Sequence, residues 1–206
     1  MYSLIKSSNL LLLKVLSIET TYRGRYLFIC VAGMPGSGKT LIVNGVKHLV
    51  DMAISMGDVV RREAMRRGIE MTPKSIMEFA KQVRREGGSD FIAKEVIKEV
   101  LNKDVEVVLV DGVRSLEEVN TFRKFGDVYV IAIHSSPKTR FLRLISRGRD
   151  GDPSDWDDFM VRDLSELELG LGSVIALADL MIVNEDLSVD ELVSQVVNKV
   201  RELVRR

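Results

Sequence analysis

Five short runs of apolar residues recur along the chain, and each gives way to glycine or polar residues. The runs are 27–32, 53–55, 105–110, 128–133 and 180–183. A continuous apolar run is typical of a strand that is buried on both faces of a parallel sheet. In α/β proteins the ligand site lies at the carboxyl ends of such strands. The pattern therefore predicts five parallel strands with a binding site where they end.

The segments between these runs carry signals for helices. Ser115 with Glu118, and Ser188 with Glu191, have the spacing of a capping box, in which both side chains bond free N–H groups at a helix start. Helices are predicted near 38–51, 58–68, 73–86, 89–102, 115–125, 136–147, 155–169 and 188–204. Strands that alternate with helices predict a three-layer α/β fold with right-handed crossovers.

Two segments depart from simple alternation. About three helices separate the second apolar run from the third, so we interpret 58–90 as a small helical insertion. The segment from Arg147 to Pro153 is rich in glycine and charge, and glycine and proline mark loops. We interpret 147–160 as a lid. Residues 26–206 are expected to form one domain, preceded by an extension over residues 1–25.

Charge and cysteine content narrow the function classes. The 206 residues include 30 Lys and Arg against 30 Asp and Glu, so the formal net charge is zero. This balance argues against a general binder of nucleic acids or acidic membranes, which would show a basic excess. Cys30 is the only cysteine, so an intrachain disulfide is excluded and a cytoplasmic location is expected. No apolar run reaches the roughly 20 residues of a transmembrane helix.

A phosphate-binding motif follows the first predicted strand. Gly33-Met34-Pro35-Gly36-Ser37-Gly38-Lys39-Thr40 matches G-x-x-x-x-G-K-[ST] at every fixed position. Glycines let the backbone wrap a phosphate with its N–H groups pointing inward, and the helix start adds a favourable partial charge. Lys39 is expected to reach the β- and γ-phosphates, and Thr40 to offer its hydroxyl to Mg²⁺. The motif therefore predicts binding of Mg·ATP.

The third predicted strand ends in Asp111. A carboxylate at such a strand tip can hold Mg²⁺ directly or through water. The alternative is a turn-forming Asp-Gly pair. Beside a complete phosphate-binding loop, we favour the metal role.

Arginines near two strand ends suggest an acceptor site. Phosphoryl transfer depends mainly on positioning and charge neutralisation, and the planar arginine fork suits phosphate contacts. Arg61 and Arg114 follow the second and third predicted strands. Asp58 lies beside Arg61, where it could take the proton of an attacking hydroxyl or merely cap a helix.

A second group of arginines precedes the lid. Arg140, Arg143 and Arg147 share one face of a predicted helix, and Arg162 follows the lid. We expect Arg140 to contact the nucleotide and Arg147 to act on the transferring phosphoryl group. The alternative is that these arginines pair with the acidic residues of 150–158.

The ordered motifs resemble P-loop nucleotide kinases of the adenylate kinase and dephospho-CoA kinase group. The chain looks closest to a mainly archaeal branch of adenylate-kinase-like ATP-binding proteins. The resemblance rests on four segments: 33–40, Met56-Gly57-Asp58-Val59-Val60-Arg61, Asp111-Gly112-Val113-Arg114, and Ala178-Asp179 through Asn184. It covers the chain from about Tyr26 onward.

The resemblance implies roles for particular residues. By similarity to adenylate kinases, Arg61 and Arg114 would contact a nucleoside monophosphate, although the segment that ends at Arg114 is one residue shorter here. By similarity to dephospho-CoA kinases, Asp58 would face an acceptor hydroxyl, and Asn184 would lie on the adenine side.

Three functions stay open on these grounds. The leading hypothesis is transfer of the γ-phosphoryl group of Mg·ATP to a small nucleotide-like acceptor, a nucleoside monophosphate first of all. The first alternative is phosphorylation of a ribose hydroxyl, as in dephospho-CoA. The second is an ATP-binding switch or slow ATPase that serves a protein partner.

Overall fold

A five-stranded parallel sheet forms the centre of the protein, as the computed structural model shows for residues 25–205. The strands are β1 (Tyr26–Ala32), β2 (Met52–Ser55), β3 (Val107–Asp111), β4 (Gly126–His134) and β5 (Leu180–Val183). Their spatial order is β2-β3-β1-β4-β5, and every neighbouring pair is parallel. The five predicted strands and their parallel arrangement are confirmed.

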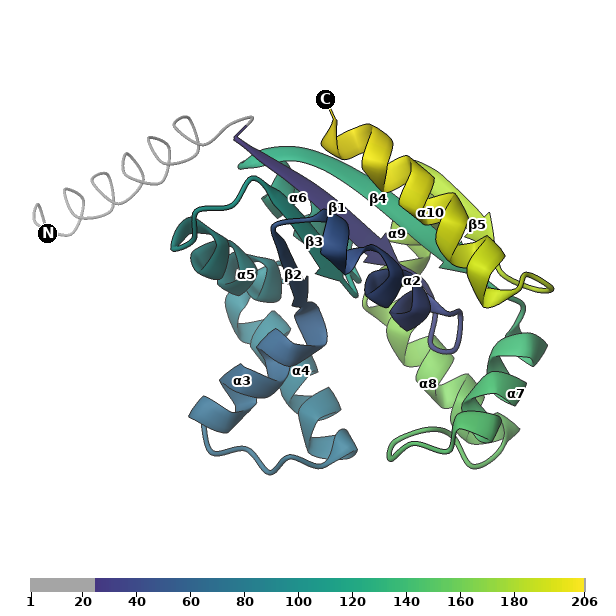
Figure 1. Cartoon of the computed structure of the whole chain (residues 1–206). Helices are drawn as coiled ribbons and strands as arrows, with labels where there is room; N and C mark the ends of the chain where they lie inside the picture. Colours follow the sequence, from purple (N-terminus) through teal and green to yellow (C-terminus); the bar gives the residue numbers. More distant parts are fainter. Residues whose placement is uncertain (1–24, 206) are drawn as a thin grey trace, which may run out of the picture.

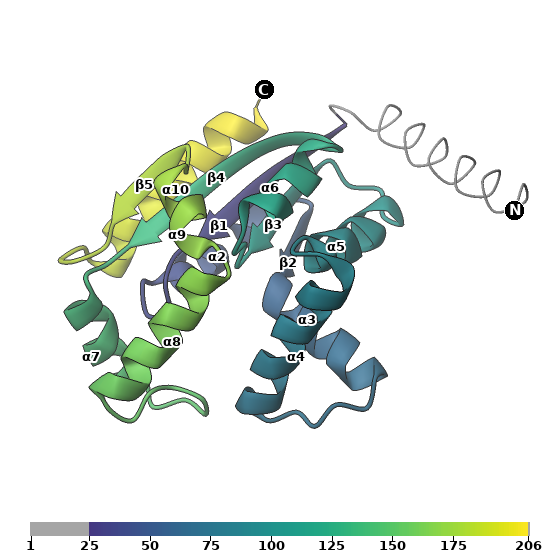
Figure 2. The same ribbon diagram turned by 180° about the vertical axis from the view of Figure 1, so that it is seen from behind.

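Helices cover both faces of this sheet. The helices are α2 (Lys39–Val46), α3 (Met56–Arg66), α4 (Pro73–Gly87), α5 (Phe91–Leu101), α6 (Leu116–Arg123), α7 (Pro137–Arg147), α8 (Trp156–Glu168), α9 (Leu171–Ala176) and α10 (Val189–Val204). A 3₁₀ turn at Lys47–Leu49 follows α2. Helices α2 and α10 pack on one face, and α5, α6 and α9 cover the other (Figures 1 and 2).

Burial on both faces explains why the strands read as unbroken apolar runs. In β1, Phe28 and Cys30 join the core beneath α5 and α6, whereas Ile29 and Val31 join the core beneath α2 and α10. All four side chains are fully buried. Because neither face of the central strand meets water, every position along it must be apolar.

The helices differ from the prediction at several boundaries and by one additional helix. Helix α3 begins at Met56 instead of 58, because Ser55 is its N-cap and accepts a hydrogen bond from the Asp58 backbone N–H. The predicted helix 155–169 is followed by an unpredicted helix, α9. Gly170 separates α8 from α9 with a φ of +100°, a left-handed conformation that favours glycine.

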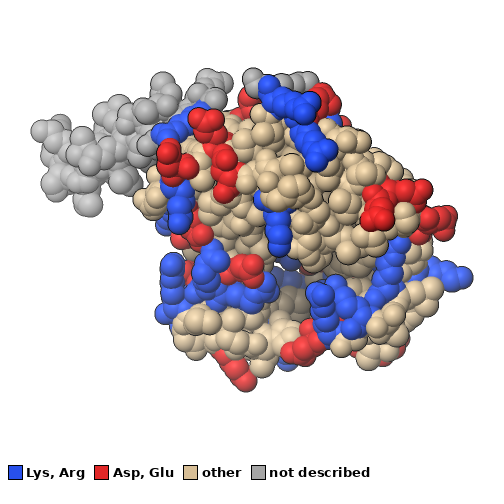
Figure 3. All heavy atoms as spheres, in the orientation of Figure 1, with Lys and Arg blue, Asp and Glu red and all other residues tan. Residues whose placement is uncertain are grey.

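Two groups of helices flank the carboxyl ends of the strands. Helices α3 and α4 lie on the β2 side, while α7, the loop 148–155 and α8 lie opposite (Figure 1). The molecular surface is hollowed between them, with Lys and Arg side chains around the hollow (Figure 3). Within residues 25–205, every helix is too short or too polar to cross a membrane.

Candidate active site

The loop between β1 and α2 owes its shape to glycine. Gly33, Gly36 and Gly38 have φ values of +154°, +82° and +104°. A side chain at any of them would meet a neighbour: a Cβ on Gly33 would lie 2.5 Å from the Ile133 carbonyl oxygen, for example. The loop therefore combines left-handed backbone with close packing, which glycine alone accommodates.

Polar side chains beneath the loop hold its backbone. The buried Asn184 amide donates to the Ser37 carbonyl over 2.8 Å, and the Ser135 hydroxyl donates to the Asn184 carbonyl over 2.5 Å. Arg140 donates to the Pro35 carbonyl over 3.2 Å and forms a two-point ion pair with buried Asp163. Asn184 and Arg140, which were expected on the nucleotide, thus support the loop from behind.

Lys39 folds back over this loop. Its Nζ donates to the carbonyl of Gly33 over 2.5 Å and to that of Met34 over 3.3 Å. Burial lowers the pKa of Lys39 to about 8, and the nearby Asp111 carboxylate partly offsets this effect. The ammonium group is thus poorly solvated. The negative charge of nucleotide phosphates would offset the free-energy cost of that burial.

Asp111 ends β3 within the electrostatic reach of Lys39. Its Oδ1 is buried and has no hydrogen-bond partner among the described residues. Burial raises the pKa of this carboxyl above its usual range, although Lys39 and Arg114 oppose the rise. A buried carboxylate oxygen with no partner suits a hard cation, so Asp111 fits a Mg²⁺ site shared with the Thr40 hydroxyl and nucleotide phosphates.

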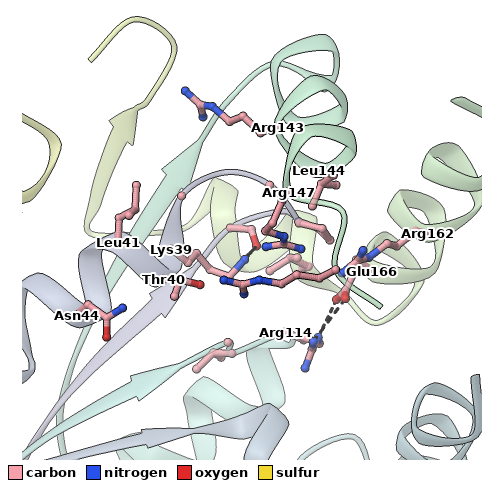
Figure 4. Close-up of a pocket in the computed structure, with 18 residues that line it drawn as sticks. Lys39, Thr40, Leu41, Asn44, Arg114, Arg143, Leu144, Arg147, Arg162 and Glu166 are labelled. Atoms are coloured by element: carbon pink, nitrogen blue, oxygen red, sulfur yellow. Dashed lines mark hydrogen bonds and ion pairs between the residues drawn. The ribbon is translucent and has the colours of Figure 1, made fainter. Parts of the chain in front are cut away.

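A cavity of about 430 Å³ opens in front of the loop. Six loop residues line it, namely Gly33, Pro35, Gly36, Gly38, Lys39 and Thr40. Leu41 and Asn44 of α2 and the arginines 114, 143, 147, 149 and 162 complete much of its wall (Figure 4). Met34 and Ser37, also predicted to bind, are buried away from it. A wall that combines glycine backbone with several arginines suits a polyphosphate.

A second cavity of about 450 Å³ adjoins the first. It lies between α3 and α4 on one side and the loop 148–155 and α8 on the other. Its cationic lining residues are Arg61, Lys74, Lys81, Arg84, Arg114 and Arg162. Arg114, Arg162 and Glu166 line both cavities, so the two meet at these residues.

Arg114 and Glu166 form an ion pair at this junction. Arg114 Nε lies 2.7 Å from Glu166 Oε2, and Nη2 lies 3.4 Å from Oε1 (Figure 4). Burial tends to raise the pKa of Glu166, but the charge and hydrogen bonds of Arg114 outweigh it and hold the pKa below its usual range. Buried Glu118 accepts from the Arg114 backbone N–H over 2.7 Å and pairs with Arg84 of α4 over 2.9 Å.

The loop 148–155 is tied to both flanking helices by Asp152. This carboxylate pairs with Arg147 at the end of α7 and with Arg162 of α8, the latter over 3.2 Å. The hydrogen bonds from Arg147 lower the pKa of Asp152 to about 2. The alternative of ion pairing with the acidic segment 150–158 therefore holds for Arg147 and Arg162, which still line the first cavity, but not for Arg140 or Arg143.

Asp58 and Arg61 pair with each other on the first turns of α3. Arg61 lines the second cavity, whereas Asp58 lines neither. The expectation that Asp58 caps the helix is wrong, because Ser55 holds that position.

Sequence reasoning missed three carboxylates: Asp163, Glu118 and Glu166. Glu118 was assigned only to a capping box, but its carboxylate contacts the backbone N–H of Arg114 and the side chain of Arg84. Arg162 and Glu166 stand four residues apart on α8, a spacing that places both on one helix face. That spacing was the available signal, but nothing along the chain shows that this face meets Arg114.

Comparison with known proteins places the chain in a family. A model of the AAA domain matches residues 32–159. A UPF0200 protein of Hyperthermus butylicus is 50% identical over 165 residues, which cover 80% of this chain and 88% of the relative. The chain belongs to the UPF0200 family. Another member, from Staphylothermus marinus, is 43% identical over 182 residues and is covered over 95% of its length.

Solved structures share the fold at low sequence identity. TT1252 from Thermus thermophilus matches 85% of this chain and 98% of its own with a TM-score of 0.59 and 11% identity. Shikimate kinase from Acinetobacter baumannii, solved with shikimate, matches 90% of this chain and 98% of its own with a TM-score of 0.53 and 12% identity. The UPF0200 chain therefore has the fold of the P-loop kinases.

Proposed function

We propose that this protein transfers the γ-phosphoryl group of Mg·ATP to the phosphate of a nucleoside monophosphate. The observation that carries the proposal is the second cavity, which shares Arg114, Arg162 and Glu166 with the cavity of the phosphate-binding loop. Its polar lining combines six arginine and lysine side chains with four carboxylates, and its apolar lining includes Val60, Ile76 and Met77. Cations suit a phosphate, and apolar surface suits the base of a nucleotide.

Residues of the two cavities divide the work of this reaction. Lys39 and the loop N–H groups would hold the β- and γ-phosphates, while Arg61 and Arg114 would hold the acceptor phosphate. An oxygen of that phosphate forms a bond to the γ-phosphorus as the bond to the ADP oxygen breaks. Mg²⁺, held by Thr40 and Asp111, would supply charge neutralisation to the phosphates. Arg147 and Arg162 would neutralise charge on the transferring group once free of Asp152.

Asp58 and Glu166 are poorly placed or poorly suited to act as the base that a hydroxyl acceptor needs. A hydroxyl needs a base, and Asp58 is paired with Arg61 and lines neither cavity. Glu166 lies at the junction, but its lowered pKa makes it a weak base. A phosphate oxygen at neutral pH needs no deprotonation, so the proposed reaction requires neither residue as a base.

The test is a screen for ADP formation with Mg·ATP and AMP, CMP, UMP, GMP or dephospho-CoA as acceptor. We expect a nucleoside monophosphate to stimulate ADP formation. Arg61→Ala should then lower kcat/KM about tenfold or more, because a charge-assisted contact to phosphate is lost. Arg62→Ala is the matched control: the neighbouring Arg62 pairs with Glu99 outside both cavities and should leave turnover unchanged.

Two results would contradict the proposal. Stimulation by dephospho-CoA alone would support the hydroxyl acceptor. ADP formation that no acceptor stimulates, and that Arg61→Ala leaves unchanged, would support an ATPase or switch instead.

A further inference from the structure

Glu166 places a negative charge in the path of phosphate groups. Its carboxylate lines both cavities at their junction, and its side chain is 17% exposed. It lies within the electrostatic reach of Lys39 as well as Arg114. A carboxylate fixed at this point repels every phosphate that enters either cavity. The arrangement is compatible with phosphate binding only if Glu166 moves when phosphate arrives.

The contact with Arg114 has the form of a phosphate contact. Two carboxylate oxygens face the Nε and Nη2 atoms of one guanidinium, which is also how arginine holds two oxygens of a phosphate. We infer that Glu166 is a placeholder for the acceptor phosphate: it neutralises Arg114 while the second cavity is empty and is displaced by an incoming phosphate group. The inference rests on the proposed function, because it assigns the displacing anion to the acceptor.

The surroundings allow the exchange without disturbing the sheet. Arg114 follows β3, and buried Glu118 holds its backbone N–H in place. Glu166 belongs to α8, which follows the loop 148–155. Arg162 lies one turn earlier on α8 and interacts electrostatically with Glu166, so a displaced carboxylate keeps a cationic neighbour. Displacement therefore requires movement of the Glu166 side chain, while the backbone of Arg114 stays held by Glu118.

The exchange also makes Arg114 selective. A phosphate monoester carries a charge of about −1.5 to −2 at neutral pH, so it competes with a carboxylate for the guanidinium. A hydroxyl or a water molecule carries no charge and leaves the ion pair intact. The ion pair with Glu166 therefore keeps Arg114 from binding other groups until a phosphate-bearing acceptor enters the site.

The test is calorimetric titration of inorganic phosphate into the full-length protein saturated with Mg²⁺ and a non-hydrolysable ATP analogue. Glu166→Gln keeps the shape of the side chain but removes its charge. We expect this variant to bind phosphate about tenfold more tightly than the wild type, since Arg114 no longer has an ionic partner to give up. Glu168→Gln, an exposed carboxylate of the same helix that pairs with Lys81, is the matched control and should bind as the wild type does.

Removing Arg114 distinguishes the placeholder from a general charge effect. In Arg114→Ala and in the double variant Arg114→Ala/Glu166→Gln, phosphate binding should be equally weak, because the gain acts through Arg114. The inference is overturned if Glu166→Gln binds phosphate no better than the wild type, or if its gain persists without Arg114. Should Glu166→Gln not fold, Glu166→Asp shortens the reach to Arg114 and must still tighten phosphate binding.

Turnover separates this inference from the proposed function. ADP formation stimulated by any of AMP, CMP, UMP or GMP is measured on the wild type alone. Its absence would overturn the proposed function, whereas the phosphate titrations decide the role of Glu166 in either case.

Discussion

Lys39 shows at the scale of one residue how burial prepares a group for its ligand. Its ammonium is removed from water and rests on two backbone carbonyls, which are weaker partners than phosphate oxygens. Burial lowers its pKa to about 8, because a poorly solvated position disfavours the charged form. Nucleotide phosphates would favour the charged form and raise the pKa again.

This shift predicts a pH dependence of nucleotide binding. Above pH 8 the free protein loses the Lys39 proton, so Mg·ATP binding must restore it and the affinity should fall as the pH rises from 8 to 10. Binding in that range should take up a proton, which calorimetry in buffers of different ionisation enthalpy measures. Lys39→Ala should remove both the proton uptake and the tight binding while keeping the circular dichroism spectrum. Tight binding by Lys39→Ala would refute the role of this residue.

A comparison of substitutions at Gly38 and Gly68 separates the cost of backbone strain from the cost of steric contact. Both have a left-handed φ, +104° and +69°. A Cβ on Gly38 would lie 2.5 Å from Asn184 Nδ2, whereas a Cβ on Gly68 would have open space around it. Gly68→Ala should cost only the conformational penalty, about 1–2 kcal/mol. Gly38→Ala should cost more and also weaken Mg·ATP binding, as thermal melts and calorimetry would show; equal melting temperatures would contradict this packing.

At the scale of elements, Asp152 joins α7 to α8 across the loop 148–155. Because Arg147 and Arg162 are about a third exposed, solvent screens these pairs, and we estimate their joint contribution at about 1 kcal/mol. The observed arrangement of this loop therefore rests in part on weak, solvent-screened ion pairs.

Asp152→Asn should lower the melting temperature by roughly 2–4 °C near neutral pH. The folded-state pKa of Asp152 is about 2, below its ordinary value of 3.8. Its stabilising contribution is thus fully present above pH 4 and is lost as the pH falls toward 2. The difference in melting temperature between the wild type and Asp152→Asn should shrink over that pH range. Trp156, the single tryptophan, begins α8 beside this loop, so its fluorescence reports local loosening separately. Because Asp152 is still partly ionised at pH 2, only a difference in melting temperature that stays undiminished there would exclude ionised Asp152 as the cause.

At the scale of the whole molecule, two cavities of similar volume meet at Arg114, Arg162 and Glu166. The carboxyl ends of the strands and the loops that follow them form one wall of the hollow. Helices α3 and α4 flank it on one side, and α7 and α8 flank it on the other (Figures 1 and 3). Two ligands bound here would have their phosphates at one shared point.

One molecule that carries two nucleosides on a single chain of phosphates should therefore occupy both cavities. Its second nucleoside binds from a high effective concentration, so its affinity should exceed that of ATP by about 10²-fold or more. Calorimetry measures the dissociation constants, and Arg61→Ala should remove much of the gain. An affinity equal to that of ATP would contradict a continuous double site.

Local sequence patterns were sufficient for the fold and for the phosphate-binding loop. Both-face burial makes the five strands continuous apolar runs, and the left-handed backbone of the loop requires its glycines at a set spacing. These are constraints between residues that are near in the chain, so they can be recognised without coordinates.

The pairing of charged side chains depends on how elements that are distant in the sequence pack together. Arg140 was expected on the nucleotide, but α8 brings Asp163 against it and turns it into a support for Pro35. Asn184 is drawn beneath the same loop because β5 lies beside β4. Glu166 reaches Arg114 across 52 residues of chain. Long charged side chains have several partners of similar energy, and only the tertiary arrangement of α7, α8 and the strand ends selects among them.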